Sequence, residues 1–131
     1  MILDTSAIIA IIMKEQEAGA LAKAISTSNT VAIASPTAVE AGIVLGNHLG
    51  FNTATAVLKN FFQVMEAEII PFTQMHWQYA LKAYDKFGKG RHPAALNFGD
   101  CFSYAAAKLA KQPLLFKGND FNRTDIVVAD Y

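Results

Sequence analysis

The stretch MILDTSAIIAII, from Met1 to Ile12, shows the pattern that decides the fold. Its first four residues, Met1–Asp4, form a short apolar run that ends in an acid, which predicts a buried strand. The residues from Thr5 onward predict one broken helix or two consecutive helices, with the interruption at Lys14–Glu17. A strand is therefore followed at once by helical sequence.

The same alternation of strand and helix continues along the chain. Ser35 and Pro36 predict a helix start, because serine is a favoured N-cap and proline fits the first helical position. Thr73 predicts a second capped start. The other expected elements are helices over 36–47, 51–66, 73–88 and from Asp100, strands over 30–35, 67–72, 113–116 and 125–129, and an irregular loop over 88–99. This order predicts one domain over residues 1–131, built on an open, mainly parallel α/β sheet.

The composition agrees with a sheet that is covered on both faces. The chain has 131 residues, of which 53% are hydrophobic and 17% charged, and its mean hydropathy is +0.25. No apolar run reaches the roughly 18 residues of a membrane span. The single cysteine, Cys101, excludes an internal disulfide framework. Together with the lack of a signal-peptide pattern, these features predict a cytoplasmic protein without a membrane segment.

The charges are unevenly distributed, although the formal net charge is zero. Residues 1–79 carry three basic and six acidic side chains, a net charge of −3. Residues 80–131 carry eight basic and five acidic side chains, a net charge of +3. The second part of the chain can therefore present a local basic surface.

Four acids stand where the expected strands end or the expected helices begin: Asp4, Glu40, Asp100 and Asp120. In open parallel sheets, ligands bind beyond the carboxyl ends of the strands. Each acid alone also has a simple structural explanation. Asp4 and Asp100 could be helix N-caps. Glu40 could belong to a solvated helix face, and Asp120 could be a turn residue. Only their joint placement favours a shared role.

Carboxylates that meet at one edge repel one another, and some must take up protons unless a cation is present. A divalent cation removes this cost. Oxygen ligands without Cys or His partners favour Mg²⁺ or Mn²⁺ over Zn²⁺. The three histidines, His48, His76 and His92, show no ligand spacing. The sequence therefore predicts a magnesium or manganese site.

The segments MILDTSAIIAII, SPTAVEAGIVL, GKGRHPAALNFGDCFSYAAAKL and LLFKGNDFNRTDI occur in this order along essentially the whole chain. Together they resemble the PIN domains of VapC-type toxins, the ribonucleases of bacterial toxin–antitoxin pairs. The resemblance implies a PIN-like three-layer α/β/α sandwich with a small, mainly parallel sheet. It also implies a Mg²⁺-dependent (or Mn²⁺-dependent) endoribonuclease that cleaves single-stranded or structured RNA by metal-assisted phosphodiester hydrolysis.

By this resemblance, Asp4, Asp100 and Glu40 would be the metal ligands. Ser6 or Thr5 would add a supporting hydroxyl near the metal. The cation would lower the pKa of a water, neutralise charge on the scissile phosphate and align the attack. The three acids would hold the ion.

The fourth acid departs from the family pattern. Many PIN domains have an acid at the position of Gly118, and a related subgroup often has Asp at the position of Asn119. Asp120 is the remaining candidate for the fourth catalytic acid. Either Glu40 or Asp120 would then orient the attacking water.

RNA held against an acidic pocket also needs cationic groups beside it. The alternative for each such residue is a solvated polar loop. Phe87 and Phe98 could stack a base, but core packing explains both better. The candidates for phosphate contacts are Lys86, Lys89, Arg91, Lys117 and Arg123, with His92.

The resemblance further implies a homodimer and a VapB-type antitoxin whose tail occupies the acidic groove. The alternative function is a catalytically weak PIN-fold module that acts mainly through protein or RNA binding. Gly118 and Asn119 leave room for this alternative, whereas the other acids argue against it. A phosphatase of the haloacid-dehalogenase type is excluded, because Ser6 stands where its second aspartate is required.

Overall fold

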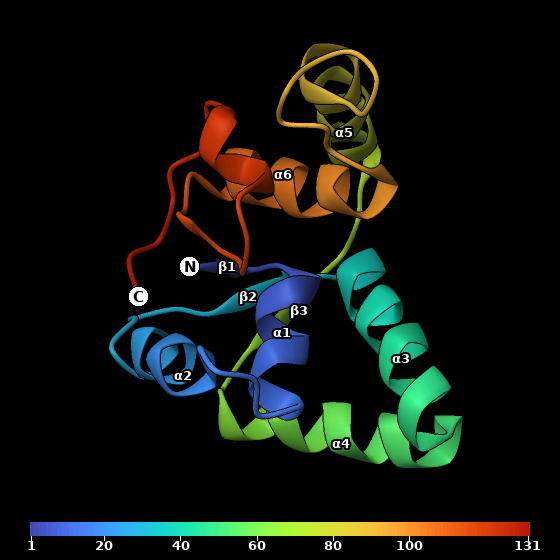
Figure 1. The fold of residues 1–131 in the computed structure, drawn as a ribbon, viewed down its shortest axis with the longest axis vertical. Coiled ribbons are helices and arrows are strands. Elements are labelled where there is room, and N and C mark those ends of the chain that lie inside the picture. Colours follow the sequence, from blue (N-terminus) through green and yellow to red (C-terminus); the bar gives the residue numbers. More distant parts are fainter.

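A four-stranded parallel sheet forms the middle of the molecule, and helices cover both of its faces (Figure 1). This computed structural model describes all 131 residues. In each neighbouring pair the strands are parallel, and Ile2 lies opposite both Ala32 and Leu114. The strands are β1 (Ile2–Leu3), β2 (Ala32–Ala34), β3 (Glu68–Ile70) and β4 (Leu114–Leu115), in the order β3-β2-β1-β4.

Helices connect these strands. The sequence after β1 forms two separate helices, and the break falls within the predicted interruption, where Lys14 has a positive φ of 55°. No helix has the length and apolarity needed to cross a membrane. The helices are α1 (Thr5–Ile12), α2 (Ala18–Ser26), α3 (Ser35–Leu49), α4 (Phe51–Val64), α5 (Gln74–Phe87), α6 (Phe98–Ala110) and the 3-10 helix η1 (Asp120–Arg123).

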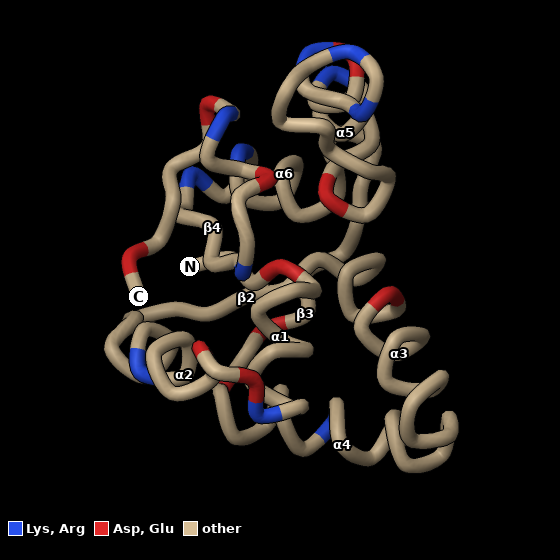
Figure 2. Tube along the Cα trace, viewed as in Figure 1, with Lys and Arg blue, Asp and Glu red and all other residues tan.

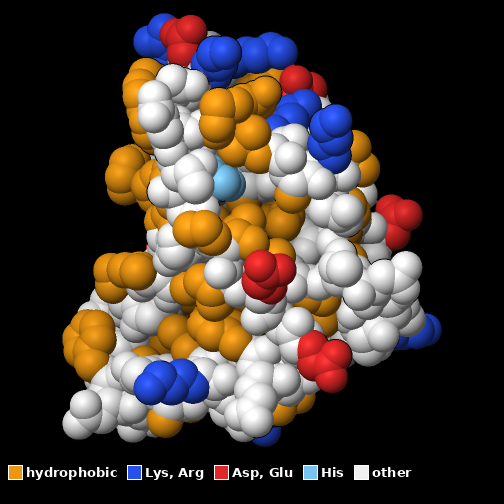
Figure 3. Space-filling model, turned by 180° about the vertical axis from the view of Figure 1, so that it is seen from behind, with side chains coloured by type: hydrophobic (Ala, Val, Ile, Leu, Met, Phe, Trp, Pro, Cys, Tyr) orange, Lys and Arg blue, Asp and Glu red, His pale blue; other side chains and the backbone are white.

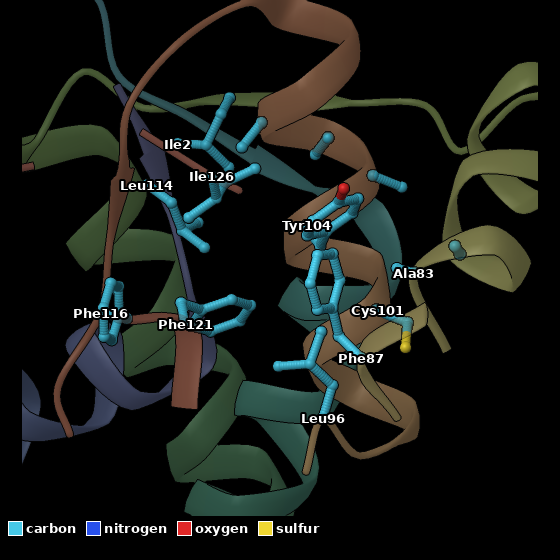
Figure 4. Close-up of a cluster of buried hydrophobic side chains, with 14 of the residues drawn as sticks. Ile2, Ala83, Phe87, Leu96, Cys101, Tyr104, Leu114, Phe116, Phe121 and Ile126 are labelled. Atoms are coloured by element: carbon cyan, nitrogen blue, oxygen red, sulfur yellow. The ribbon is translucent and has the colours of Figure 1, made fainter. Parts of the chain in front are cut away.

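Two hydrophobic cores lie on the two faces of the sheet, because successive strand residues point to opposite sides. Ile2 and Leu114 pack with the side chains of α5 and α6 (Figure 4). Their neighbours Leu3 and Leu115 pack with α1, α2, α3 and α4. All four strand side chains are at most 1% exposed. The predicted three-layer α/β/α sandwich is confirmed.

The helix starts show which capping predictions were right. Thr73 is the N-cap of α5, as the sequence predicts, and it also forms a capping box with His76. Ser35 does not cap α3: it is the first residue of the helix, and Ala34 precedes it in an extended conformation without a side-chain bond. Gly50 ends α3 as expected, since its φ of 81° is a conformation that favours glycine.

The strand predicted over residues 125–129 does not form. Only one bridge, between Leu114 and Val128, joins this segment to the sheet. Asp125 is bound to α6 instead: Tyr104 Oη donates to its carboxylate at 2.7 Å, and Lys108 Nζ donates to its carbonyl at 2.8 Å. The segment meets β4 only at Leu114, whose amide donates to the Val127 carbonyl and whose carbonyl accepts from the Ala129 amide.

Candidate active site

A pocket of about 300 Å³ lies beyond the carboxyl end of β1, beside the first turns of α1, α3 and α6. Acidic positions gather near these helix starts, whereas many of the basic positions lie at the α5 end of the molecule (Figure 2). All four acids singled out in the sequence line this one pocket. Its lining consists of Asp4, Thr5, Ser6, Ile9, Glu15, Glu40, Asn97, Asp100, Lys117, Asp120 and Phe121.

Asp4 follows β1 directly and is only 4% exposed. It caps α1, since its Oδ2 accepts hydrogen bonds from the Ser6 amide at 2.9 Å and from Ser6 Oγ at 2.6 Å. Its Oδ1 accepts a hydrogen bond from Ser103 Oγ at 2.6 Å. Three neutral donors thus hold this buried carboxylate, and no cationic side chain pairs with it. The N-cap role and the pocket role coexist.

Glu40 reaches the pocket from the second turn of α3. Thr5 Oγ1 donates a hydrogen bond to Glu40 Oε2 at 2.8 Å, so the two predicted hydroxyls serve different acids. The carboxylate packs against Gly99 of α6, where a Cβ atom would lie 2.4 Å from Oε1. Burial raises the pKa of Glu40, and the charge of Asp4 raises it further against the opposing Thr5 bond.

Asp100 is the third residue of α6, not its cap. Asn97 is the N-cap: its Oδ1 accepts from the Asp100 amide at 2.9 Å, while Asp100 Oδ2 accepts from the Asn97 amide at 2.8 Å. The pKa of Asp100 is raised to about 7, chiefly by burial and also by the negative charges of Asp4, Asp120 and Glu40, while the bond from the Asn97 amide opposes the rise.

Asp120 begins η1 and lines the pocket, whereas Asn119 does not. The side chain of Asn119 is used elsewhere, because its Oδ1 accepts from Asn122 Nδ2 at 3.1 Å. Gly118 has a φ of 106°, a conformation that strains any other residue. An acid at that position would therefore be unfavourable in this chain.

The donor set suits a hard divalent cation. Glu40 Oε1, Asp100 Oδ1 and both oxygens of Asp120 accept no hydrogen bond from the protein. Carboxylate oxygens of this kind are the preferred ligands of Mg²⁺. No group of three Asp, Glu, His or Cys side chains is arranged in this structure to hold a metal ion. The acids fit such an ion by their chemistry and their common pocket, and their side chains would have to come closer together to bind it.

Lys117 is the one predicted RNA contact that lies in the pocket. Its ammonium group pairs with Glu15 and also with Glu17, whose Oε2 lies 3.2 Å away. These two carboxylates raise the pKa of Lys117 and more than neutralise its charge. The Lys117 amide donates to Ser6 Oγ at 2.9 Å, so the backbone of this residue supports the pocket.

The other four predicted RNA contacts lie outside the pocket. Lys86 and Arg91 are ion-paired with carboxylates at 3.6 Å and 2.7 Å. Lys89 and Arg123 form no ion pair, which leaves their charges free. Among the five predicted contacts, these two alone offer a phosphate a positive charge that no carboxylate neutralises.

An apolar groove of about 620 Å³ lies between α5 and the start of α6 and shares Asn97 with the acidic pocket. Phe98 in its lining is 78% exposed, so the expectation that it packs in the core was wrong. Phe87 is 4% exposed and does pack there. Hydrophobic side chains also cover much of the face seen in Figure 3. The remaining lining residues are Phe72, Trp77, Ala80, Leu81, Tyr84, Lys89, Cys101 and Phe102.

Sequence reasoning missed the residues that support the acids. Ser103 donates a hydrogen bond to Asp4, and Gly99 packs against Glu40. Asn97 donates a hydrogen bond to Asp100. Asn97 stands three residues before Asp100, which is the spacing of a capping box, and this spacing could have identified Asn97. Nothing local marks Ser103, because its partner lies 99 residues away.

Comparison with known proteins agrees with this arrangement. The PIN domain family profile matches residues 1–127. Ribonuclease VapC28 of Mycobacterium tuberculosis is 41% identical over 127 residues, which cover 96% of this chain and 95% of that protein. Among solved structures, VapC20 of M. tuberculosis, described as a sarcin-ricin loop cleaving toxin, has a TM-score of 0.78 at 15% identity, covering 99% and 98% of the two chains. A chain of a toxin–antitoxin complex from Klebsiella pneumoniae has a TM-score of 0.72 at 18% identity, with 99% and 97% covered. The match over nearly its full length places the chain in the PIN-domain family, among the VapC proteins.

Proposed function

We propose that this chain is a Mg²⁺- or Mn²⁺-dependent endoribonuclease and the toxin of a VapBC-type toxin–antitoxin pair. The observation that carries the proposal is the meeting of Asp4, Glu40, Asp100 and Asp120 in one pocket. The identity of 41% to a protein named ribonuclease supports RNA as the substrate. A weak binding module would have no need to keep four mutually repelling carboxylates together, which disfavours that alternative.

In this proposal Asp4, Glu40 and Asp100 hold the cation. When bound, the ion supplies charge neutralisation at the scissile phosphate and lowers the pKa of water beside it. Ser6 and Thr5 keep Asp4 and Glu40 in orientation through their hydroxyl groups. Glu40 or Asp120 orients the attacking water, and the pKa of Glu40, which burial raises, makes its carboxylate a stronger proton acceptor than an exposed one.

Lys89 and Arg123 are the proposed phosphate contacts with the least competition, since neither has an acidic partner. A phosphate could bind three of the residues only by breaking an ion pair with a carboxylate: Lys86, Arg91 and Lys117. Breaking that ion pair costs free energy, so each of these residues contributes less to RNA binding than an unpaired cation does. We therefore assign most of the phosphate contact to the unpaired residues.

Cleavage of a labelled RNA tests the proposed function directly. The purified chain is expected to cut the RNA with Mg²⁺ or Mn²⁺ and to lose this activity with a chelator. Asp4→Asn is expected to be inactive with either ion, because an uncharged amide is a poor ligand for a hard cation. Equal cleavage by both proteins, or by neither, would contradict the assignment.

The stability of the metal-free protein is expected to fall as the pH rises. The pKa of Asp100 is raised from 3.8 to about 7 in the folded state. The stability that its protonated form contributes is therefore complete below pH 3.8 and lost as the pH rises through about 7. A cation would offset the charge of the ionised carboxylate. Mn²⁺ should thus raise the melting temperature more at pH 8 than at pH 5; equal shifts in differential scanning fluorimetry would contradict this.

We also propose a VapB-type antitoxin as partner, a homodimer as the assembled form and the cytoplasm as the location. The antitoxin is supported by the shared fold with a chain solved in a toxin–antitoxin complex. Exposed apolar side chains, among them Trp77, Leu81 and Phe98, offer surface for a second copy. Sedimentation of the purified chain, alone and with a co-expressed antitoxin, measures both assemblies.

A further inference from the structure

Two fully buried hydroxyl groups lie beneath the acidic pocket. Thr37 and Ser103 are both 0% exposed, and their hydroxyl oxygens are 3.3 Å apart. Ser103 Oγ lies 2.6 Å from Asp4 Oδ1. A buried hydroxyl costs free energy unless it is hydrogen-bonded, so apolar side chains would fill this space more simply. The pair therefore has a role other than packing.

The direction of these hydrogen bonds follows from the number of protons available. Ser103 has a single hydroxyl proton, and it donates that proton to Asp4 Oδ1. The bond between the two hydroxyls then runs from Thr37 to Ser103. Donation by Thr37 polarises the Ser103 hydroxyl and strengthens its bond to the carboxylate.

This chain of bonds joins the three elements that carry the proposed ligands. Asp4 directly follows β1, Thr37 lies three residues before Glu40 on α3, and Ser103 lies three residues after Asp100 on α6. Residues three apart are neighbours on a helix surface. Each hydroxyl is thus placed beside the acid of its own helix, and both lead to the carboxylate of the third element.

We propose that Ser103 and Thr37 are positioning residues of the acidic pocket: Ser103 orients the Asp4 carboxylate, and Thr37 orients Ser103. Ser6 donates twice to Oδ2 and Ser103 once to Oδ1, so three of the about four acceptor positions of the carboxylate are filled. The position that stays free is on Oδ1. Asp4 accordingly offers a cation one oxygen in one orientation. This role rests on the proposed function, since it assigns the buried bonds to the cation site.

Isothermal titration of Mn²⁺ into the full chain measures the positioning role without relying on activity. Ser103→Ala removes one heavy atom and should weaken Mn²⁺ binding by about 10–100-fold, the usual loss when a group that orients a metal ligand is removed. Thr37→Val keeps the shape but loses the hydroxyl, and should weaken binding less. Thr37→Ser keeps the hydroxyl and should restore the affinity. In RNA cleavage, the loss in Ser103→Ala should fall on kcat more than on KM.

Cys101→Ala is the matched control, because it also removes one heavy atom from a buried side chain of α6. Cys101 Sγ bonds only to the Asn97 carbonyl, whereas the Asn97 amide and side chain hold Asp100, and no hydrogen bond joins Cys101 to Asp4. Wild-type Mn²⁺ affinity is expected for it. The proposal is overturned if Ser103→Ala unfolds cooperatively and binds Mn²⁺ within twofold of wild type. It is also overturned if Cys101→Ala loses as much Mn²⁺ affinity as Ser103→Ala. If Ser103→Ala does not fold, unchanged affinity in Thr37→Val overturns it instead.

A metal-free measurement separates this proposal from the proposed function. Urea unfolding of Asp4→Ala, Ser103→Ala and the double variant should give non-additive midpoint shifts, because both single changes break the same bond. Additive shifts overturn the positioning role even if RNA is cleaved. If wild type neither binds Mn²⁺ nor cleaves RNA, the proposed function fails, and non-additive shifts still show that Ser103 orients Asp4.

Discussion

Replacing Asp100 by asparagine is expected to lower RNA cleavage by about 10²–10³-fold and to stabilise the metal-free protein by about 1 kcal/mol at pH 8. Cleavage falls because the pocket loses a charged ligand. Stability rises because the carboxylate is partly buried beside Asp4, Asp120 and Glu40, which raises its pKa to about 7. An uncharged side chain removes this repulsion. Initial cleavage rates and chemical unfolding measure the two effects.

Asn at position 100 can still accept the hydrogen bond from the Asn97 amide, so the start of α6 is retained. Asp100→Ala provides the contrast, since it loses both the charge and the bond. It should be as inactive as Asp100→Asn but less stable by about 0.5–2 kcal/mol. If Asp100→Asn is inactive and also less stable than wild type, the Asp100 carboxylate stabilises the fold and its loss of activity does not show a role in cleavage.

Gly99→Ala is expected to lower cleavage by about 10–100-fold without harming the fold. The new Cβ atom would lie 2.4 Å and 2.5 Å from the two carboxylate oxygens of Glu40, so this carboxylate must move. Moving it is cheap for the fold because it is the end of a flexible side chain. Alanine itself favours a helix over glycine by about 0.5–1 kcal/mol. The result is a stable protein whose Glu40 is displaced from Thr5 and from the other acids.

Gly19→Ala is the matched control on α2. A Cβ atom there has no heavy atom within 4 Å, and the residue is also helical. It should gain similar stability and keep full cleavage activity. If Gly99→Ala cleaves RNA as fast as Gly19→Ala, the position of Glu40 does not matter for the reaction.

The positions of the acids could be predicted because each one depends on local order along the chain. Asp4 directly follows an apolar strand, and parallel strands bring their carboxyl ends to one edge of the sheet. Glu40 and Asp100 lie near helix starts that face the same edge. The topology therefore brought these side chains into one pocket without any knowledge of their contacts.

Three features of the structure could not be predicted from the sequence pattern, because each depends on which of several possible partners a side chain binds. Asn97 and Asp100 are both good capping residues, and the fold uses the first as the cap and the second as its partner. Lys117 has the positive charge that a phosphate contact needs, but it forms ion pairs with two glutamates of the α1–α2 connection. Asp125 binds Tyr104, so the expected last strand is lost. Such outcomes are decided by contacts between residues far apart in sequence.

Three successive side chains at the start of the chain go to three different destinations. Ile2 enters one core, Leu3 enters the other, and Asp4 faces the pocket. A deletion or insertion of a single codon there would therefore damage both layers of packing and the chemistry at once. Selection cannot improve these positions separately, so variation that tunes this protein is expected in the exposed helices and loops, where a change has only one consequence.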